Sequence, residues 1–250
     1  MKTRLAQALE TLPQAKYHRC IFVLGHMRAG STALTNVLAA HPQISGCGEA
    51  HVAYGAGYGP GRLLLRLMHQ RALSPTARFL CDKILHSPLH HGVPEGFYDA
   101  HAVFILRSPG PAIASIQRLS QKVPQTGLAD LERAGAYYLD RLAAMDATWV
   151  RFAPSRRVGI SADALWEDPE GTLARVSERL PLETPLRNHF APQAKAQRAG
   201  GGDPLADPQA ARIIARRHAA PQALHCADAL QERCARAYAK LLGAFRAEDA

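Results

Sequence analysis

The chain has 250 residues, of which 47% are hydrophobic, and its formal net charge is +9. This length and composition suit one substantial hydrophobic core, so we expect a single domain. No run approaches the roughly 20 apolar residues that span a bilayer, and the N-terminus lacks the apolar stretch of a signal peptide. These features exclude a membrane-spanning protein and predict a cytoplasmic one.

The cysteines and the basic residues narrow the class of function. The five cysteines form an odd count without a C-x-x-C pair, which argues against a disulfide framework and a zinc ribbon, so we expect reduced and mostly buried thiols. The positive charge predicts an anionic partner. Basic residues occur in small dispersed groups, such as Arg156-Arg157 and Arg216-Arg217, without interleaved aromatic residues. We therefore expect a phosphorylated nucleotide in a basic cleft and no nucleic acid.

Strands and helices alternate along most of the chain. Strands that consist of continuous apolar runs, alternating with helices, predict an α/β fold with a P-loop-like central parallel sheet flanked by helices on both faces. The expected strands are 20–25, 78–83, 101–107 and 157–160, and the expected helices are 31–40, 109–122, 130–152 and 169–180.

The last third of the chain differs in composition. Residues 182–208 are rich in Pro, Gly and Gln, which predicts a long irregular loop, and 208–245 have the spacing of two helices. We expect one domain over 1–250. Its parts are an N-terminal helix or arm at 1–18, an α/β core at 19–182, and an irregular loop with C-terminal helices at 183–250.

The segment from Gly25 to Thr32 predicts an anion site. It joins the first strand to the first helix, where loop amides, first-turn N–H groups and the helix dipole favour a negative charge. The nucleotide triphosphatase pattern G-x-x-x-x-G-K-[ST] requires a lysine after the second glycine, but Ser31 stands there and the loop's cation is Arg28. The loop therefore suits one terminal phosphate; a tight turn without ligand is the alternative.

A second anion site is expected after the strand at 101–107. Arg107 ends that strand, and a helix that begins at a proline carries Ser115. Both side chains could face the cleft between neighbouring strands, where open α/β sheets bind ligands. An arginine fork and a hydroxyl suit a phosphate monoester. The alternative is a surface arginine paired with a carboxylate.

Together these segments resemble the sulfotransferase family that uses 3′-phosphoadenosine 5′-phosphosulfate. The first loop and helix lead into His-Pro-Gln-Ile and Gly-Glu, and Leu-Arg-Ser-Pro follows with a serine eight positions after its arginine. The run from Asp163 to Glu170 resembles the family segment in which an acidic-leucine pair precedes Asp-Pro-Glu, although Ala162 replaces a common tyrosine. The resemblance covers about residues 20–182.

The resemblance implies a role for each matching residue. Arg28, Ala29, Gly30, Ser31 and Thr32 would hold the 5′-phosphosulfate of the donor. Its 3′-phosphate would be held by Arg107 and Ser115, and closed by the basic residues before Gly200, for which the candidates are Lys195 and Arg198. The product of the donor would be adenosine 3′,5′-bisphosphate.

Sulfuryl transfer requires a base and positive charge on the leaving phosphate. Lys83, which resembles a lysine after this strand in the family, and Arg28 would stabilise that phosphate without a metal; a solvated surface lysine is the alternative. Glu49 is the first candidate for the base, because several branches of the family place a glutamate there. His86 is its rival and His51 the third candidate.

The acceptor cannot be named from these residues. It would be a hydroxyl or an amine on a small molecule, glycan or lipid, bound by 49–70, the loop after Lys83 and the C-terminal segment. Tyr54 and Tyr58 are expected in a surface loop or mobile lip, and other histidines, including His90 and His91, at the surface. The rival functions are a P-loop nucleotide kinase or phosphotransferase and a non-catalytic nucleotide-binding module.

Overall fold

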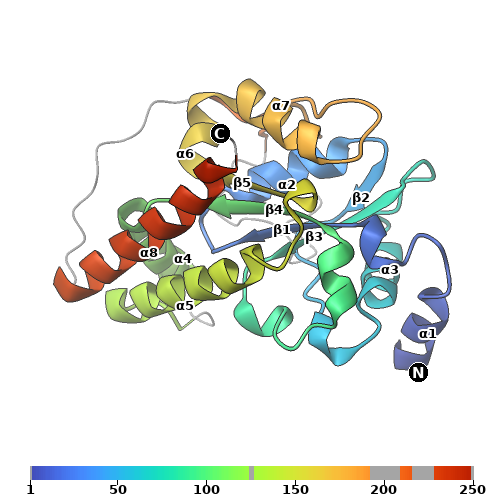
Figure 1. Cartoon of the computed structure of the whole chain (residues 1–250), viewed down its shortest axis with the longest axis horizontal. Coiled ribbons are helices and arrows are strands. Elements are labelled where there is room, and N and C mark those ends of the chain that lie inside the picture. The colour runs from blue at the N-terminus through green and yellow to red at the C-terminus, as the bar shows by residue number, and fades with distance from the viewer. Residues whose placement is uncertain (1, 124–126, 192–208, 216–227, 249–250) are drawn as a thin grey trace.

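Five parallel strands form the central sheet of the computed structural model, which describes residues 2–123, 127–191, 209–215 and 228–248 (Figure 1). The strand order is β2-β3-β1-β4-β5, and every neighbouring pair is parallel. The strands are β1 (Cys20–Gly25), β2 (Ile44–Gly46), β3 (Phe79–Ile84), β4 (His101–Leu106) and β5 (Arg157–Ser161).

Helices cover both faces of this sheet (Figure 1). Alternate residues of a strand point to opposite faces, so Ile21 and Val23 of β1 enter one core while Phe22 and Leu24 enter the other. Both faces are buried, which explains the continuous apolar runs. The helices are α1 (Lys2–Leu9), α2 (Ser31–Ala40), α3 (Gly59–His69), α4 (Pro109–Lys122), α5 (Leu131–Trp149), α6 (Ala162–Glu167), α7 (Pro169–Arg179) and α8 (Asp228–Ala247).

The α/β prediction is confirmed, and most element bounds agree to within a few residues. The strand at 20–25 and the helices at 31–40 and 109–122 have the predicted bounds. Local capping fixes two further helix starts. The Asp130 side chain accepts from the Arg133 amide before α5, and the Asp168 side chain accepts from the Gly171 amide before α7.

Three elements were not predicted, namely β2, α3 and α6. β2 has only three residues, too few for a detectable period, and α6 has six. α3 begins Gly59-Pro60-Gly61, which resembles a turn in sequence. In the fold Gly61 lies against α1, where a Cβ would be 2.0 Å from the Ala6 carbonyl oxygen. Close helix packing therefore selects this glycine.

Several side chains expected at the surface are buried. Tyr54 is fully buried and donates to Asp82 Oδ2 at 2.7 Å, so its prediction as part of a surface lip was wrong. His90 was also expected at the surface and is buried beside Arg141. Both were misjudged because their polar atoms have partners distant in sequence. Of the cysteines, Cys20, Cys81 and Cys234 are buried free thiols, Cys47 is partly exposed, and Cys226 lies outside the described residues.

The C-terminal third is described only in part. α8 is the second of the two helices expected there, and residues 209–215 are irregular. The glycine run at 200–202 and the candidates Lys195 and Arg198 lie outside the described residues. Within the part of the chain that the structure describes, no helix is long and apolar enough to cross a membrane.

Replacing Tyr54 by Phe should lower the free energy of unfolding by about 2 kcal/mol, because it removes a donor to a buried carboxylate and leaves the ring packing intact. Urea unfolding at pH 7.5 would measure this change. The matched control is Tyr98→Phe, which removes an exposed hydroxyl contact to Arg151 and should cost less than about 0.5 kcal/mol. Equal effects of the two substitutions would contradict the assignment of Tyr54.

Candidate active site

The loops that follow β1, β3 and β4 meet at one edge of the sheet. β1 lies between β3 and β4, with Leu24 opposite Ile84 and Gly25 opposite Ile105. In a parallel sheet the carboxyl ends of adjacent strands lie at the same edge. The two predicted anion segments and the segment after Lys83 are therefore neighbours in space.

The loop between β1 and α2 is shaped by two left-handed residues. Arg28 has a φ of 65° and Gly30 a φ of 83°. Gly30 is the N-cap of α2 and has no side chain with which to cap the first amides of the helix. A Cβ at Gly30 would also lie 3.1 Å from Cζ2 of Trp166. This curled backbone ahead of a helix N-terminus suits an anion.

His26 connects this loop to the start of the segment after β4. Its Nε2 lies 3.0 Å from the Arg107 amide and therefore accepts that N–H. Its Nδ1 lies 2.8 Å from the Met27 carbonyl oxygen and carries the proton as donor. Burial lowers the pKa of His26 to about 4, so the ring is neutral at neutral pH. The neutral imidazole of His26 therefore fixes the distance between the two loops.

The basic residues of the two predicted anion segments lie together. Arg28 Nε donates to Ser115 Oγ at 2.9 Å, so the Arg28 side chain reaches α4. Arg107 Nη1 donates to the Arg28 carbonyl oxygen at 3.3 Å, and its guanidinium lies over the Trp166 ring at 5.0 Å from the centroid. Residues 79 to 87 positions apart therefore form one cluster of positive charge.

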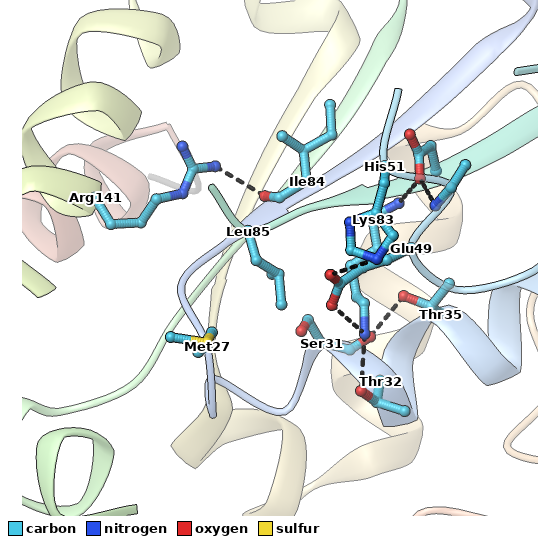
Figure 2. Close-up of polar contacts among 12 residues, drawn as sticks. Met27, Ser31, Thr32, Thr35, Glu49, His51, Lys83, Ile84, Leu85 and Arg141 are labelled. Carbon is cyan, nitrogen blue, oxygen red and sulfur yellow. Dashed lines mark hydrogen bonds and ion pairs between the residues drawn. The ribbon is translucent and has the colours of Figure 1, made fainter. Parts of the chain in front are cut away.

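Lys83 lies beside the first loop and Glu49 (Figure 2). Its side chain is almost fully buried, which excludes a solvated surface lysine. Nζ donates to Thr32 Oγ1 at 3.0 Å and lies 3.2 Å from Glu49 Oε1. The second carboxylate oxygen of Glu49 lies 3.7 Å from Nε2 of His51, whose side chain is half exposed. The predicted cation and the first candidate base are thus in contact.

Asp82 orders the backbone around this pair from the opposite face of β3. Its Oδ1 accepts from the amides of Ala50 and Lys83, both at 2.8 Å, and Tyr54 donates to Oδ2. Burial raises the pKa of Asp82 to about 6. The Lys83 amide also donates to the Gly48 carbonyl oxygen at 3.2 Å. Both neighbours of Glu49 are therefore tied to β3.

Three residues of α5 hold the strand ends and the loops, and none of them was predicted as part of the site. Arg141 is fully buried and donates from Nε to the Gly25 carbonyl oxygen at 2.7 Å. Its Nη2 donates to the Ile84 carbonyl oxygen at 2.8 Å (Figure 2). Tyr137 accepts from the Met27 amide at 2.8 Å, and Tyr138 donates to the Arg107 carbonyl oxygen at 2.8 Å. The only sequence signal was polar residues on a buried helix face.

The remaining candidates lie around this centre. His86 packs beside the Tyr137 ring, with centroids 6.0 Å apart, and burial lowers its pKa below the usual value. Ala162, which replaces the tyrosine expected from the resemblance, is fully buried. In the described ranges from 2 to 248, no three His, Cys, Asp or Glu residues are grouped as metal ligands.

Comparison with known proteins identifies a family and several solved structures that are similar to this chain. The family model described as "Sulfotransferase family" matches residues 20–59 and 61–185. A sulfotransferase domain from the curacin biosynthetic pathway is 17% identical, with a TM-score of 0.58 and coverage of 86% of this chain and 95% of that domain.

Two further solved structures are similar. The sulfotransferase domain of the Synechococcus PCC 7002 olefin synthase is 20% identical, with a TM-score of 0.53 over 88% of this chain and 94% of that one. A sulfotransferase from Alicyclobacillus acidocaldarius is 14% identical, with a TM-score of 0.50 over 72% and 88%. At these identities the likeness shows the fold. No match was found among curated protein sequences.

The neutral His26 predicts a loss of stability in acid. Its pKa is 6.5 in the unfolded chain and about 4 in the fold, so between these values the unfolded state binds more protons. The stability present above pH 6.5 is therefore lost as the pH falls towards 4, by up to about 1.4 kcal/mol per pH unit. The free energy of unfolding, measured with urea from pH 7 to 5, should fall less steeply with decreasing pH in His26→Asn than in the unchanged chain. Equal slopes would contradict the burial of a neutral ring.

Proposed function

Because the chain belongs to the sulfotransferase family, and is an enzyme of that kind, we propose that its donor is 3′-phosphoadenosine 5′-phosphosulfate and that its acceptor is a hydroxyl or an amine. The observation that carries this proposal is the cluster of Arg28, Arg107 and Ser115 beside the N-terminus of α2. Two anion-binding segments side by side suit a nucleotide with phosphate groups at two places. The family generally uses this donor.

The donor would lie across the two segments. Its 5′-phosphosulfate would accept from the Gly30 amide and from the amides and hydroxyls of Ser31 and Thr32. The Ala29 amide donates to the His26 carbonyl oxygen at 3.3 Å and would have to exchange this partner to bind the ligand. Its 3′-phosphate would be bound by Arg107 and Ser115. Arg28 connects the two ends, because its backbone belongs to the first loop and its Nε reaches Ser115.

The proposed reaction is an in-line displacement at sulfur. Glu49 accepts the proton of the acceptor hydroxyl while the acceptor oxygen bonds to sulfur. The bond between sulfur and the 5′-phosphate oxygen breaks, and the products are a sulfate ester and adenosine 3′,5′-bisphosphate. Lys83 would neutralise the charge that develops on the leaving phosphate, and its contacts with Thr32 and Glu49 support this role.

The residues around Glu49 would bind the acceptor. These belong to 49–70 and to the loop after β3, and Leu85 in that loop belongs to the same buried cluster as Met27. The family supports a small-molecule acceptor. The serine after Gly30, in place of a lysine, disfavours a nucleotide kinase.

Arg28→Ala and Arg107→Ala should each weaken binding of adenosine 3′,5′-bisphosphate by about 10- to 150-fold, because each removes a charged donor to phosphate. Isothermal titration calorimetry would measure both affinities. Arg118→Ala is the matched control, because Arg118 is exposed and lies one helical turn after Ser115. This variant should bind the bisphosphate as tightly as the unchanged chain. Unchanged affinity in both test variants, or tight binding of magnesium ATP, would exclude the proposed donor.

Glu49→Gln should lower turnover at saturating donor by about two to four orders of magnitude, because the amide cannot accept the proton. Binding of adenosine 3′,5′-bisphosphate should remain. Turnover would be followed by release of the bisphosphate with a panel of hydroxylated and amine acceptors. The exposed Glu232→Gln is the matched control. Full activity of Glu49→Gln would exclude Glu49 as the base, and parallel assays of His86→Gln and His51→Gln would then locate it.

A further inference from the structure

Trp166 contacts both halves of the proposed donor site. Its indole packs against the first loop, where a Cβ at Gly30 would lie only 3.1 Å from Cζ2. The Arg107 guanidinium lies over the same ring, 5.0 Å from its centroid. The Trp166 side chain therefore lies between the N-terminus of α2 and the end of β4.

The position of Trp166 is determined by α6. The first turn of this helix is capped by Ser161, whose Oγ accepts from the Ala164 amide at 3.0 Å. Leu165, the preceding residue, is fully buried among the residues of the core that contains α2 and α7. With that neighbour anchored, the indole is directed towards Gly30 and Arg107 by the helix rather than by the ligand.

A guanidinium that lies over an indole face is held through its π surface, while the N–H groups at its edge remain in the guanidinium plane. Those edge donors are the groups that bind phosphate oxygens in a fork. Arg107 Nη1 already uses one edge donor for the Arg28 carbonyl oxygen at 3.3 Å. The ring and this carbonyl together orient the rest of the fork.

We propose that Trp166 is a positioning residue that orients Arg107 for the 3′-phosphate and so makes the enzyme select nucleotides that carry this group. The proposal rests on the donor assigned above. If it is correct, loss of the indole weakens binding of adenosine 3′,5′-bisphosphate more than binding of adenosine 5′-phosphate. A residue that merely supports the first loop would affect both nucleotides alike.

The test compares the two nucleotides by calorimetry. Trp166→Ala should weaken bisphosphate binding by about 2- to 30-fold, the range expected for a cation–π contact, and Trp166→Phe should restore most of it. In Arg107→Ala, adding Trp166→Ala should cause no further loss, because the two residues act as a unit. Equal weakening of both nucleotides, an unchanged bisphosphate affinity or additive losses would each overturn the proposal.

Tryptophan fluorescence provides an independent measurement with a matched control. The chain contains two tryptophans, and Trp149 is buried against Phe104 and Phe245 in the core. Adding bisphosphate should change the emission of Trp149→Phe, which retains Trp166, and leave that of Trp166→Phe unchanged. The opposite pattern would overturn the role of Trp166. Absence of bisphosphate binding to the unsubstituted chain would instead overturn the donor assignment.

Discussion

A fully buried guanidinium, that of Arg141, joins α5 to the carboxyl ends of β1 and β3. The carbonyl groups of Gly25 and Ile84 lie where the two strands end and their chains diverge. Burying a cation is costly, and burial lowers the pKa of Arg141 to about 10, but main-chain oxygens compensate and the group stays charged at neutral pH. Because both strand ends are held by one side chain, the loops that follow them begin from fixed points, and the geometry of the whole site depends on this interaction.

Two adjacent polar residues of β3 have separate partners on the two faces of the sheet. Asp82 and Lys83 are adjacent in sequence and point to opposite faces of the sheet. Lys83 reaches the start of α2 and Glu49, whereas Asp82 receives the Tyr54 hydroxyl and two amides in the other core. The carboxylate organises the backbone that presents Glu49, and the cation contacts its side chain. Both polar residues are tolerated in a buried strand because each is hydrogen-bonded.

The sequence predicted what depends on neighbours along the chain and missed what depends on distant partners. The bounds of β1, α2 and α4 follow from local signals, namely a continuous apolar run, a glycine before a hydroxyl, and Pro109 at a helix start. Tyr54 was misplaced because its partner Asp82 is 28 residues away, and His26 was overlooked because its partner Arg107 is 81 residues away. The motifs singled out Arg28, Ser115 and Lys83 as candidates, and only the fold shows that the Arg28 side chain lies at Ser115.

His26 has a consequence for the thermodynamics of recognition. A ligand with two phosphate groups at the spacing of the two loops loses its translational and rotational freedom once for both contacts, which is the chelate effect. The benefit depends on rigidity, because loops that drifted apart would make the second contact at a low effective concentration. With one neutral ring bonded to Met27 and to Arg107, the protein has bridged the two loops before any ligand arrives. For the proposed donor, the distance between the two loops would then contribute to selectivity together with the individual phosphate contacts.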